Sequence, residues 1–167
     1  MPEKQTLQRA EQDKEEGKAP STQAGEFVRE EIHHVREGKH GARSTKQAIA
    51  IGLSKARRAG VKLGVPKKGK ASSSTRKQAA RDLGKAKTHT KTSAKRSRAV
   101  SNRLKREGRS AASPQSLSRQ ARSASRKRTS AERHQAAMKA VRTKGSTGRK
   151  QAAKKAAKTR TTQRRAA

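Results

Sequence analysis

The scarcity of large apolar side chains limits what this chain can fold into more than any other feature. Leu, Ile, Val and Phe number 16 in 167 residues, and ten of them lie between Phe27 and Val65. Alanine accounts for 28 further apolar residues, but a methyl group buries little surface. Chains with so few large apolar residues and so many charges are expected to be largely disordered. The sequence therefore predicts one small core, within residues 21–65.

Charge divides the chain into an acidic head and a basic body. Residues 1–37 carry nine acidic and six basic residues, whereas residues 38–167 carry three acidic and 40 basic residues. The net charge of the whole chain is +34. Such asymmetry favours a polyanionic partner. We expect residues 1–20 to be a disordered acidic leader that either solubilises the chain or folds back on the basic tail.

The first predicted helix spans residues 22–37. Ser21 or Thr22 can cap its start, and its apolar residues recur at the spacing of an amphipathic helix. Gly38 or Gly41 can end it, because glycine readily adopts the left-handed conformation that follows a helix.

The second predicted helix spans residues 45–59. Ser44 and Gln47 have the spacing of a capping box, and Gly60 ends the pattern. Residues 61–65 are expected to form a short extended flap over the resulting hairpin. A unit of about 45 residues rarely stands alone, so we expect homodimerisation through the hairpin or folding on a ligand.

Residues 66–167 are predicted to be a basic, low-complexity tail that is only conditionally helical. Lys, Arg, Ala and Gln favour helix, but the tail has almost nothing to bury, and propensity alone rarely holds a short helix in water. The predicted fold class is thus mainly α with extensive disorder: a helical hairpin followed by a long basic tail. Ser113 and Pro114 form the clearest helix start in this tail.

The basic body predicts sequence-independent nucleic-acid binding. Lys and Arg neutralise phosphates, and the counterions that they release supply the affinity. The predicted contacts are Lys46, Lys55, Arg57, Arg58, Lys67, Lys68, Arg76, Lys77, Arg96, Arg98, Arg103, Lys105, Arg106, Arg126, Lys127, Arg128, Arg149, Lys150, Lys154, Lys155, Lys158, Arg164 and Arg165.

DNA is favoured over RNA, because single-strand binders usually stack bases on aromatic rings and the tail has none. The favoured function is compaction of duplex DNA by a histone-like, nucleoid-associated protein. One alternative is an RNA- or ribosome-associated factor. Another is an adaptor whose hairpin binds a protein partner while the tail tethers it to a polyanion.

A helix-turn-helix reading of the hairpin would make residues 45–59 the recognition helix. Its outward side chains would then be Lys46, Gln47, Lys55, Arg57 and Arg58. No third helix is evident to complete the core of such a motif, so we favour a plain helical hairpin.

Metal and enzyme chemistry find little support in the sequence. His33, His34 and His40 suggest a metal site, and Glu30 with His33, like Glu31 with His34, has the Glu-x-x-His spacing of carboxylate-bridged sites. Those sites require four converging helices, and Glu30 and His33 are expected on the solvent-facing side of their helix. Surface ion pairing is therefore predicted, with no metal and no cofactor. No catalytic constellation can be assembled, and a rigid scaffold to hold one is missing.

Two resemblances support this interpretation. Residues 21–32 (STQAGEFVREEI) and 42–60 (ARSTKQAIAIGLSKARRAG) resemble a family of small, Lys/Arg-rich bacterial proteins of uncharacterised function that are often labelled DNA-binding. Residues 151–158 (QAAKKAAK) are similar to linker-histone-like tails of bacterial nucleoid proteins. The resemblance implies a bacterial source. With no apolar run long enough for a bilayer, we expect a cytoplasmic, nucleoid location and no membrane partner.

Overall fold

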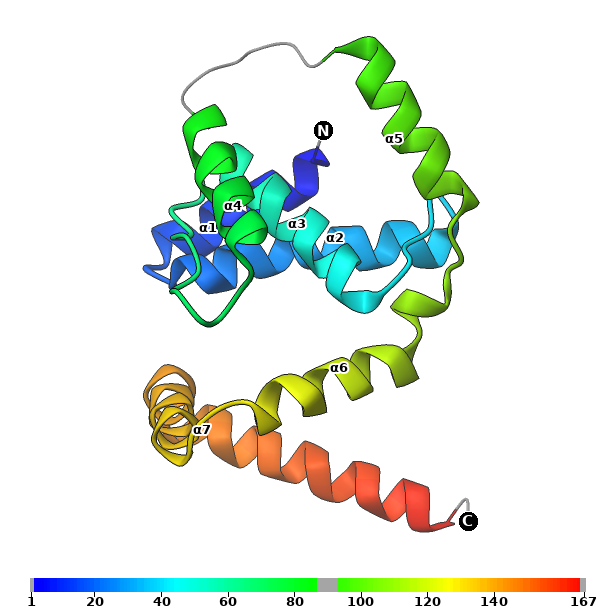
Figure 1. Ribbon diagram of the computed structural model, residues 1–167. Helices are drawn as coiled ribbons and strands as arrows, with labels where there is room; N and C mark the ends of the chain where they lie inside the picture. Colours follow the sequence, from blue (N-terminus) through cyan, green and yellow to red (C-terminus); the bar gives the residue numbers. More distant parts are fainter. Residues whose placement is uncertain (1, 87–92, 166–167) are drawn as a thin grey trace. The chain divides into compact units, whose positions relative to one another are not determined.

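The computed structural model of the protein describes residues 2–86 and 93–165, apart from the side chains of residues 143, 144 and 163–165. The chain divides into two compact units, residues 1–120 and residues 121–167, each taken separately below. None of the described helices is long and apolar enough to cross a membrane. The elements, drawn in Figure 1, are α1 (Lys4–Glu15), α2 (Pro20–Glu37), α3 (Thr45–Arg58), α4 (Ser73–Lys85), α5 (Ala94–Arg106), the 3-10 turn η1 (Ser110–Ala112), α6 (Pro114–Arg126) and α7 (Ser130–Arg165).

The predicted fold class, a helical hairpin with a long disordered tail, is wrong. The described residues form helices along the whole chain, and the first unit extends far beyond residues 21–65. The physical reason for the larger first unit lies in alanine. Eight of the twelve buried apolar residues in the described part are alanines, from Ala10 to Ala112, so the core is built largely from methyl groups at close helix contacts.

The two predicted helices are confirmed as α2 and α3, with small differences at their ends. Pro20 occupies the first turn of α2, and Gly38 ends it in the left-handed conformation at φ 79°. The Ser44 hydroxyl caps α3 by accepting from the backbone N–H of Gln47 at 3.2 Å. The return bond of the capping box differs, because the Gln47 side chain accepts from the N–H of Arg43.

Helices α2 and α3 pack against each other more closely than ordinary side chains would allow. Gly52 on α3 faces the backbone of α2, and a Cβ added there would lie 2.7 Å from Cα of Val28. Small apolar clusters flank this crossing. One gathers Ile32, Val35, Ala42, Ala48, Ala111 and Ala112, and the other gathers Ala10, Ala24, Phe27, Ala56 and Val61. Residues 61–65 form no strand, although Val61 and Leu63 do pack on the second cluster.

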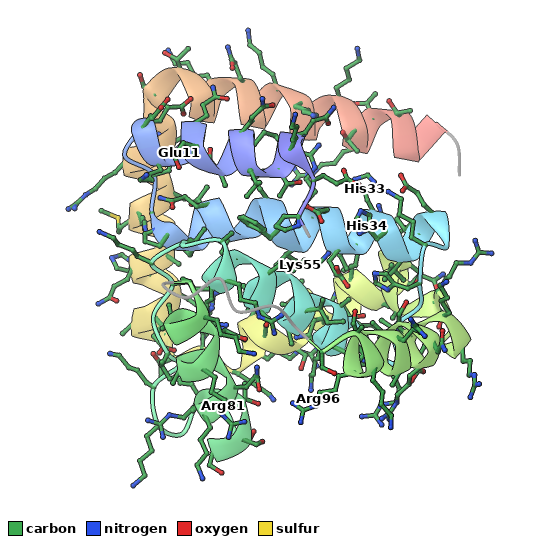
Figure 2. All side chains as sticks on the ribbon, turned by 90° about the horizontal axis from the view of Figure 1, so that it is seen from above. Glu11, His33, His34, Lys55, Arg81 and Arg96 are labelled. Carbon is green, nitrogen blue, oxygen red and sulfur yellow. The ribbon has the colours of Figure 1, made fainter. Side chains whose placement is uncertain are left out.

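The expected disordered leader is instead helix α1, which lies beside α2 (Figure 2). Ala10 and Thr6 are buried in the contact. At its edge, Arg9 pairs with Glu26 at 2.7 Å. Other acidic residues of this segment pair locally, as in the contact of Asp13 with Lys18 at 2.7 Å. Neither reading of the leader, as a solubilising segment or as a competitor for the tail, anticipated this packing.

Residues 104–112, expected in the tail, dock on the α2–α3 connection. The N–H of Gly41 donates to the carbonyl of Leu104 at 2.8 Å, and the N–H of Ala42 donates to that of Gly108 at 3.0 Å. Farther on, the Thr45 hydroxyl donates to the carbonyl of Ala111 at 2.6 Å. These bonds satisfy the backbone of a segment whose own side chains bury little.

Helix α4 is held on α3 by a buried carboxylate. Asp82, 1% exposed, accepts from the Ser54 hydroxyl at 2.6 Å, from Arg58 Nε at 2.9 Å and from Gln78 Nε2 at 3.1 Å. Three donors on one buried carboxylate offset the cost of its desolvation. Together with Ala79, this anchor places α4 in the first unit.

The second unit is made of exposed helix. It contains the end of α6 and all of α7, and α7 breaks at Gly145, where φ is 61° and ψ is −173°. The predicted start of α6 is confirmed, since Pro114 is its first residue and the Ser113 hydroxyl accepts from the N–H of Ser116 at 3.2 Å.

Candidate nucleic-acid interface

Most of the predicted contact residues lie on the surface. Helix α5 has six basic residues among 13 and no acidic residue, and none of its side chains is buried. The second unit contains 16 basic residues and one acidic residue, Glu132. The exposed predicted contacts are Lys46, Arg58, Lys67, Lys68, Lys77, Arg96, Arg98, Arg103, Lys105, Arg106, Arg126, Lys127, Arg128, Arg149, Lys150, Lys154, Lys155 and Lys158. Arg164 and Arg165 have side chains outside the described part.

Three of the predicted contacts have structural roles instead. Arg57 is 6% exposed, and its guanidinium donates to the carbonyls of Leu63 at 3.3 Å and Gly64 at 3.5 Å. Arg76 is half-buried and donates to the carbonyl of Pro66 at 3.0 Å. Lys55 is half-buried between α2 and α3 and pairs with two carboxylates of α2. Spacing alone could not separate these cations from the exposed ones.

Helix α3 therefore does not present the outward side chains that the recognition helix of a helix-turn-helix needs. Of the five side chains expected to point outward from α3, Arg57 is buried and Lys55 is engaged by α2. Gln47 caps the helix start, and Arg58 pairs with Asp82. Only Lys46 keeps an exposed side chain without one of these contacts.

Replacing Arg57 by Gln is expected to destabilise the fold by about 1–3 kcal/mol, because the buried guanidinium no longer donates to the carbonyls of Leu63 and Gly64. The same change is expected to leave the salt dependence of DNA binding as in the parent protein. Lys46→Gln, on the same helix, should do the reverse: unchanged stability and a shallower salt dependence. Urea unfolding and binding at several salt concentrations measure both quantities. A shallower salt dependence for Arg57→Gln would contradict this assignment.

A cavity of about 770 Å³ lies between α2, α3 and α5 in the first unit. Ser97, Ser101 and Arg96 line it from α5, and Lys55 and Arg58 line it from α3. Figure 2 labels Lys55 between α2 and α3, and Arg96 on α5. The cavity thus brings together three predicted contacts, Lys55, Arg58 and Arg96, although the first two are already paired with carboxylates.

Glu31, His34 and His40 line the same cavity from α2 and the loop that follows it, whereas Glu30 and His33 lie outside its lining. Glu31 is fully buried, and its oxygens lie 2.7 Å from Lys55 Nζ and 3.2 Å from His40 Nε2. Glu30, expected on the solvent-facing side, is only 4% exposed because the start of α1 covers it. His33 is exposed as expected (Figure 2).

Local hydrogen bonds and charges favour the ionised form of two carboxylates, Glu3 and Glu30. Hydrogen bonds from the His34 ring at 2.8 Å and the Lys39 ammonium at 3.0 Å lower the pKa of Glu3 to about 2. Burial works against ionisation of Glu30, but the nearby Thr6 hydroxyl, the backbone N–H of Glu3 and Lys55 outweigh it and lower its pKa.

The one aromatic ring of the sequence is unavailable to bases. Phe27 is 1% exposed and belongs to the core around Ala24 and Ala56. Base stacking on Phe, Tyr or Trp is thereby excluded.

Comparison with known proteins finds a family match for one part of the chain. Residues 20–70 match a family of unknown function, DUF6496. The expected resemblance to an uncharacterised family is confirmed at that level, over α2, α3 and the segment that follows them. No curated protein and no solved structure matches the chain.

Proposed function

We propose that this protein binds duplex nucleic acid without sequence specificity, through its exposed cations, most of which lie on α5, α6 and α7. The observation that carries the proposal is the surplus of exposed Lys and Arg on helices almost free of acidic residues. Of the three acidic residues after position 37, Asp82 is already bonded to Ser54 and holds α4 on α3. The cations of these helices are thus available to neutralise phosphates.

The proposed role is compaction of DNA in the nucleoid. Residues 1–120 carry a net charge of +19 and residues 121–167 carry +15, so each unit can neutralise phosphates by itself. Two cationic units on one chain can hold two duplex segments, and such bridging compacts DNA. The resemblance to proteins labelled DNA-binding and to linker-histone-like tails supports the same role.

DNA is proposed over RNA because the contacts available are those to a phosphate backbone. Sequence-specific RNA recognition usually splays bases onto aromatic rings or arginine planes. With Phe27 buried, that route would fall to arginine and to exposed histidines such as His33. A homodimer stays a prediction. It was expected because the predicted hairpin is small, and this reason is weaker now that α1, α4 and residues 104–112 belong to the same unit.

The experiment is a salt titration of binding by the full chain. Two duplexes of unrelated sequence and a structured RNA are compared between about 50 and 200 mM salt, a range over which 6–10 phosphate contacts lose about 10³–10⁵ in affinity. We expect equal affinities for the two duplexes, a loss of this size, and shortening of a single tethered duplex. A shallow salt dependence would overturn the proposal, and a clear preference for the RNA would overturn its DNA part.

A further inference from the structure

Glu31, His34 and His40, here termed the Glu31 cluster, converge on one point beside the cavity. Each offers one ligand atom, and these atoms all lie within 4.8 Å of one another. Glu31 and His34 come from adjacent turns of α2, and His40 comes from the loop that follows. The Glu31 side chain is fully buried, while those of His34 and His40 are 13% and 18% exposed.

The hydrogen bonds of His40 leave a lone pair facing a carboxylate. Its Nδ1 lies 3.0 Å from the carbonyl of Gly41, which can only accept, so Nδ1 carries the proton. In the neutral ring Nε2 is then an acceptor, and it lies 3.2 Å from Oε1 of Glu31. Two acceptors at this distance repel unless a cation or an added proton lies between them.

His34 has the same type of outer partner. Its Nε2 lies 2.8 Å from Oε1 of Glu3, so this nitrogen donates and the other keeps the lone pair in the neutral ring. Metal-ligating histidines characteristically donate their second N–H to a carboxylate or a backbone carbonyl. His34 has a carboxylate partner, that of Glu3, and His40 has a backbone carbonyl partner, that of Gly41.

Glu31 supplies a buried oxygen that is not fully satisfied. Neither of its oxygens accepts a hydrogen bond of normal geometry from the described part of the chain. The Lys55 ammonium lies 2.7 Å from Oε2, so that contact is an ion pair without a well-directed bond. Oε1 faces His40, on the side away from this pairing.

We propose that the Glu31 cluster binds a divalent transition-metal ion of the Zn²⁺ type. Two imidazoles and one carboxylate are a ligand set that zinc accepts, with solvent completing the coordination. Ligands about 2.1 Å from a tetrahedral ion are about 3.4 Å apart. The 3.2 Å between Glu31 Oε1 and His40 Nε2 is close to this spacing.

The proposal replaces the expectation of surface ion pairing. That expectation assumed four converging helices, whereas here one helix and its following loop provide three ligands. A bound ion would tie the loop to α2. Gly41 and Ala42 of this loop donate hydrogen bonds to the carbonyls of Leu104 and Gly108. The ion would therefore also stabilise the docking of residues 104–108.

Zn²⁺ titration of the full chain by calorimetry, after removal of nucleic acid at high salt and of metal by chelation, tests the site. We expect one Zn²⁺ per chain and a visible d–d absorption when Co²⁺ takes its place. His40→Gln should weaken binding at least about tenfold. His33→Gln is the matched control: this histidine is exposed on the same helix, and its loss should change nothing.

Two results would overturn the proposal. One is the absence of Zn²⁺ binding, with NMR showing both ring nitrogens of His40 protonated. The other is binding that both His40→Gln and Glu31→Gln leave unchanged. Circular dichroism confirms that each variant is folded, and His40→Gln, in a loop, keeps the test valid if Glu31→Gln unfolds. The readouts involve no nucleic acid, so the outcome is independent of the proposed function.

Discussion

Gly52→Ala is expected to destabilise the protein by about 2–3 kcal/mol, as an overpacked contact does. The added Cβ would lie 2.7 Å from Cα and 2.9 Å from the backbone N of Val28. Backbone atoms cannot rotate aside as a side chain can, so α2 and α3 must separate. That movement loosens the apolar clusters on both sides of the crossing. The gain of about 1 kcal/mol in helix propensity from Gly to Ala is too small to compensate.

Gly25→Ala is the matched control, since Gly25 is also in a helix but has no other atoms within 4 Å of its added Cβ. It should stabilise α2 by about 0.5–1 kcal/mol. Urea unfolding of both variants gives the comparison. Equal effects of the two substitutions would show that the close contact of α2 and α3 does not form.

Replacing Lys150, Lys154, Lys155 and Lys158 by Gln should make the salt dependence of DNA binding shallower by up to about 3.6 in log–log slope, or about 0.9 for each phosphate contact. At about 0.1 M salt this corresponds to a loss of about three orders of magnitude in affinity. All four side chains are exposed on α7, and Gln is a good helix former, so the helix should persist.

The control places Gln at Ala152, Ala153, Ala156 and Ala157, which lie between the lysines on the same helix. These changes alter the helix surface and leave its charge unchanged, so affinity and slope should stay as in the parent protein. Binding of one duplex at four or five salt concentrations measures both sets. If the lysine variant keeps the parental slope, α7 does not contact the phosphates.

Helices α2 and α3 could be predicted because their signals are local. Ser44 and Gln47 mark the start of α3 in the sequence, and Gly38 is one of two glycines suited to end α2. Burial by small residues was underestimated. Ala111 and Ala112 are no more distinctive in sequence than the exposed alanines of α7, yet they are buried. What decides their burial is the set of backbone bonds across the α2–α3 connection, which no local pattern encodes.

The positive charge of the candidate interface could be predicted, but not which of its cations are exposed. Lys46 and Arg57 look alike in the sequence, and only the chain that follows α3, with its carbonyls at Leu63 and Gly64, makes one of them internal. Asp82 gave a usable signal: an isolated acid in a basic segment is a natural partner for an arginine or a hydroxyl group. The sequence drew attention to His33, His34 and His40 and to the Glu-x-x-His spacing, but it could not show that Glu31, His34 and His40 converge, because His40 reaches the cluster from a loop.

The alanine-built core also sets how the protein responds to heat and denaturant. Unfolding such a core exposes little apolar area, and both the heat-capacity change and the denaturant m-value scale with that area. The unfolding transition is correspondingly broad, and the stability curve is flat over temperature. A polyanion that binds only the folded chain adds stability by mass action. Under the proposed function, the concentration of nucleic acid would therefore set part of the stability of this protein.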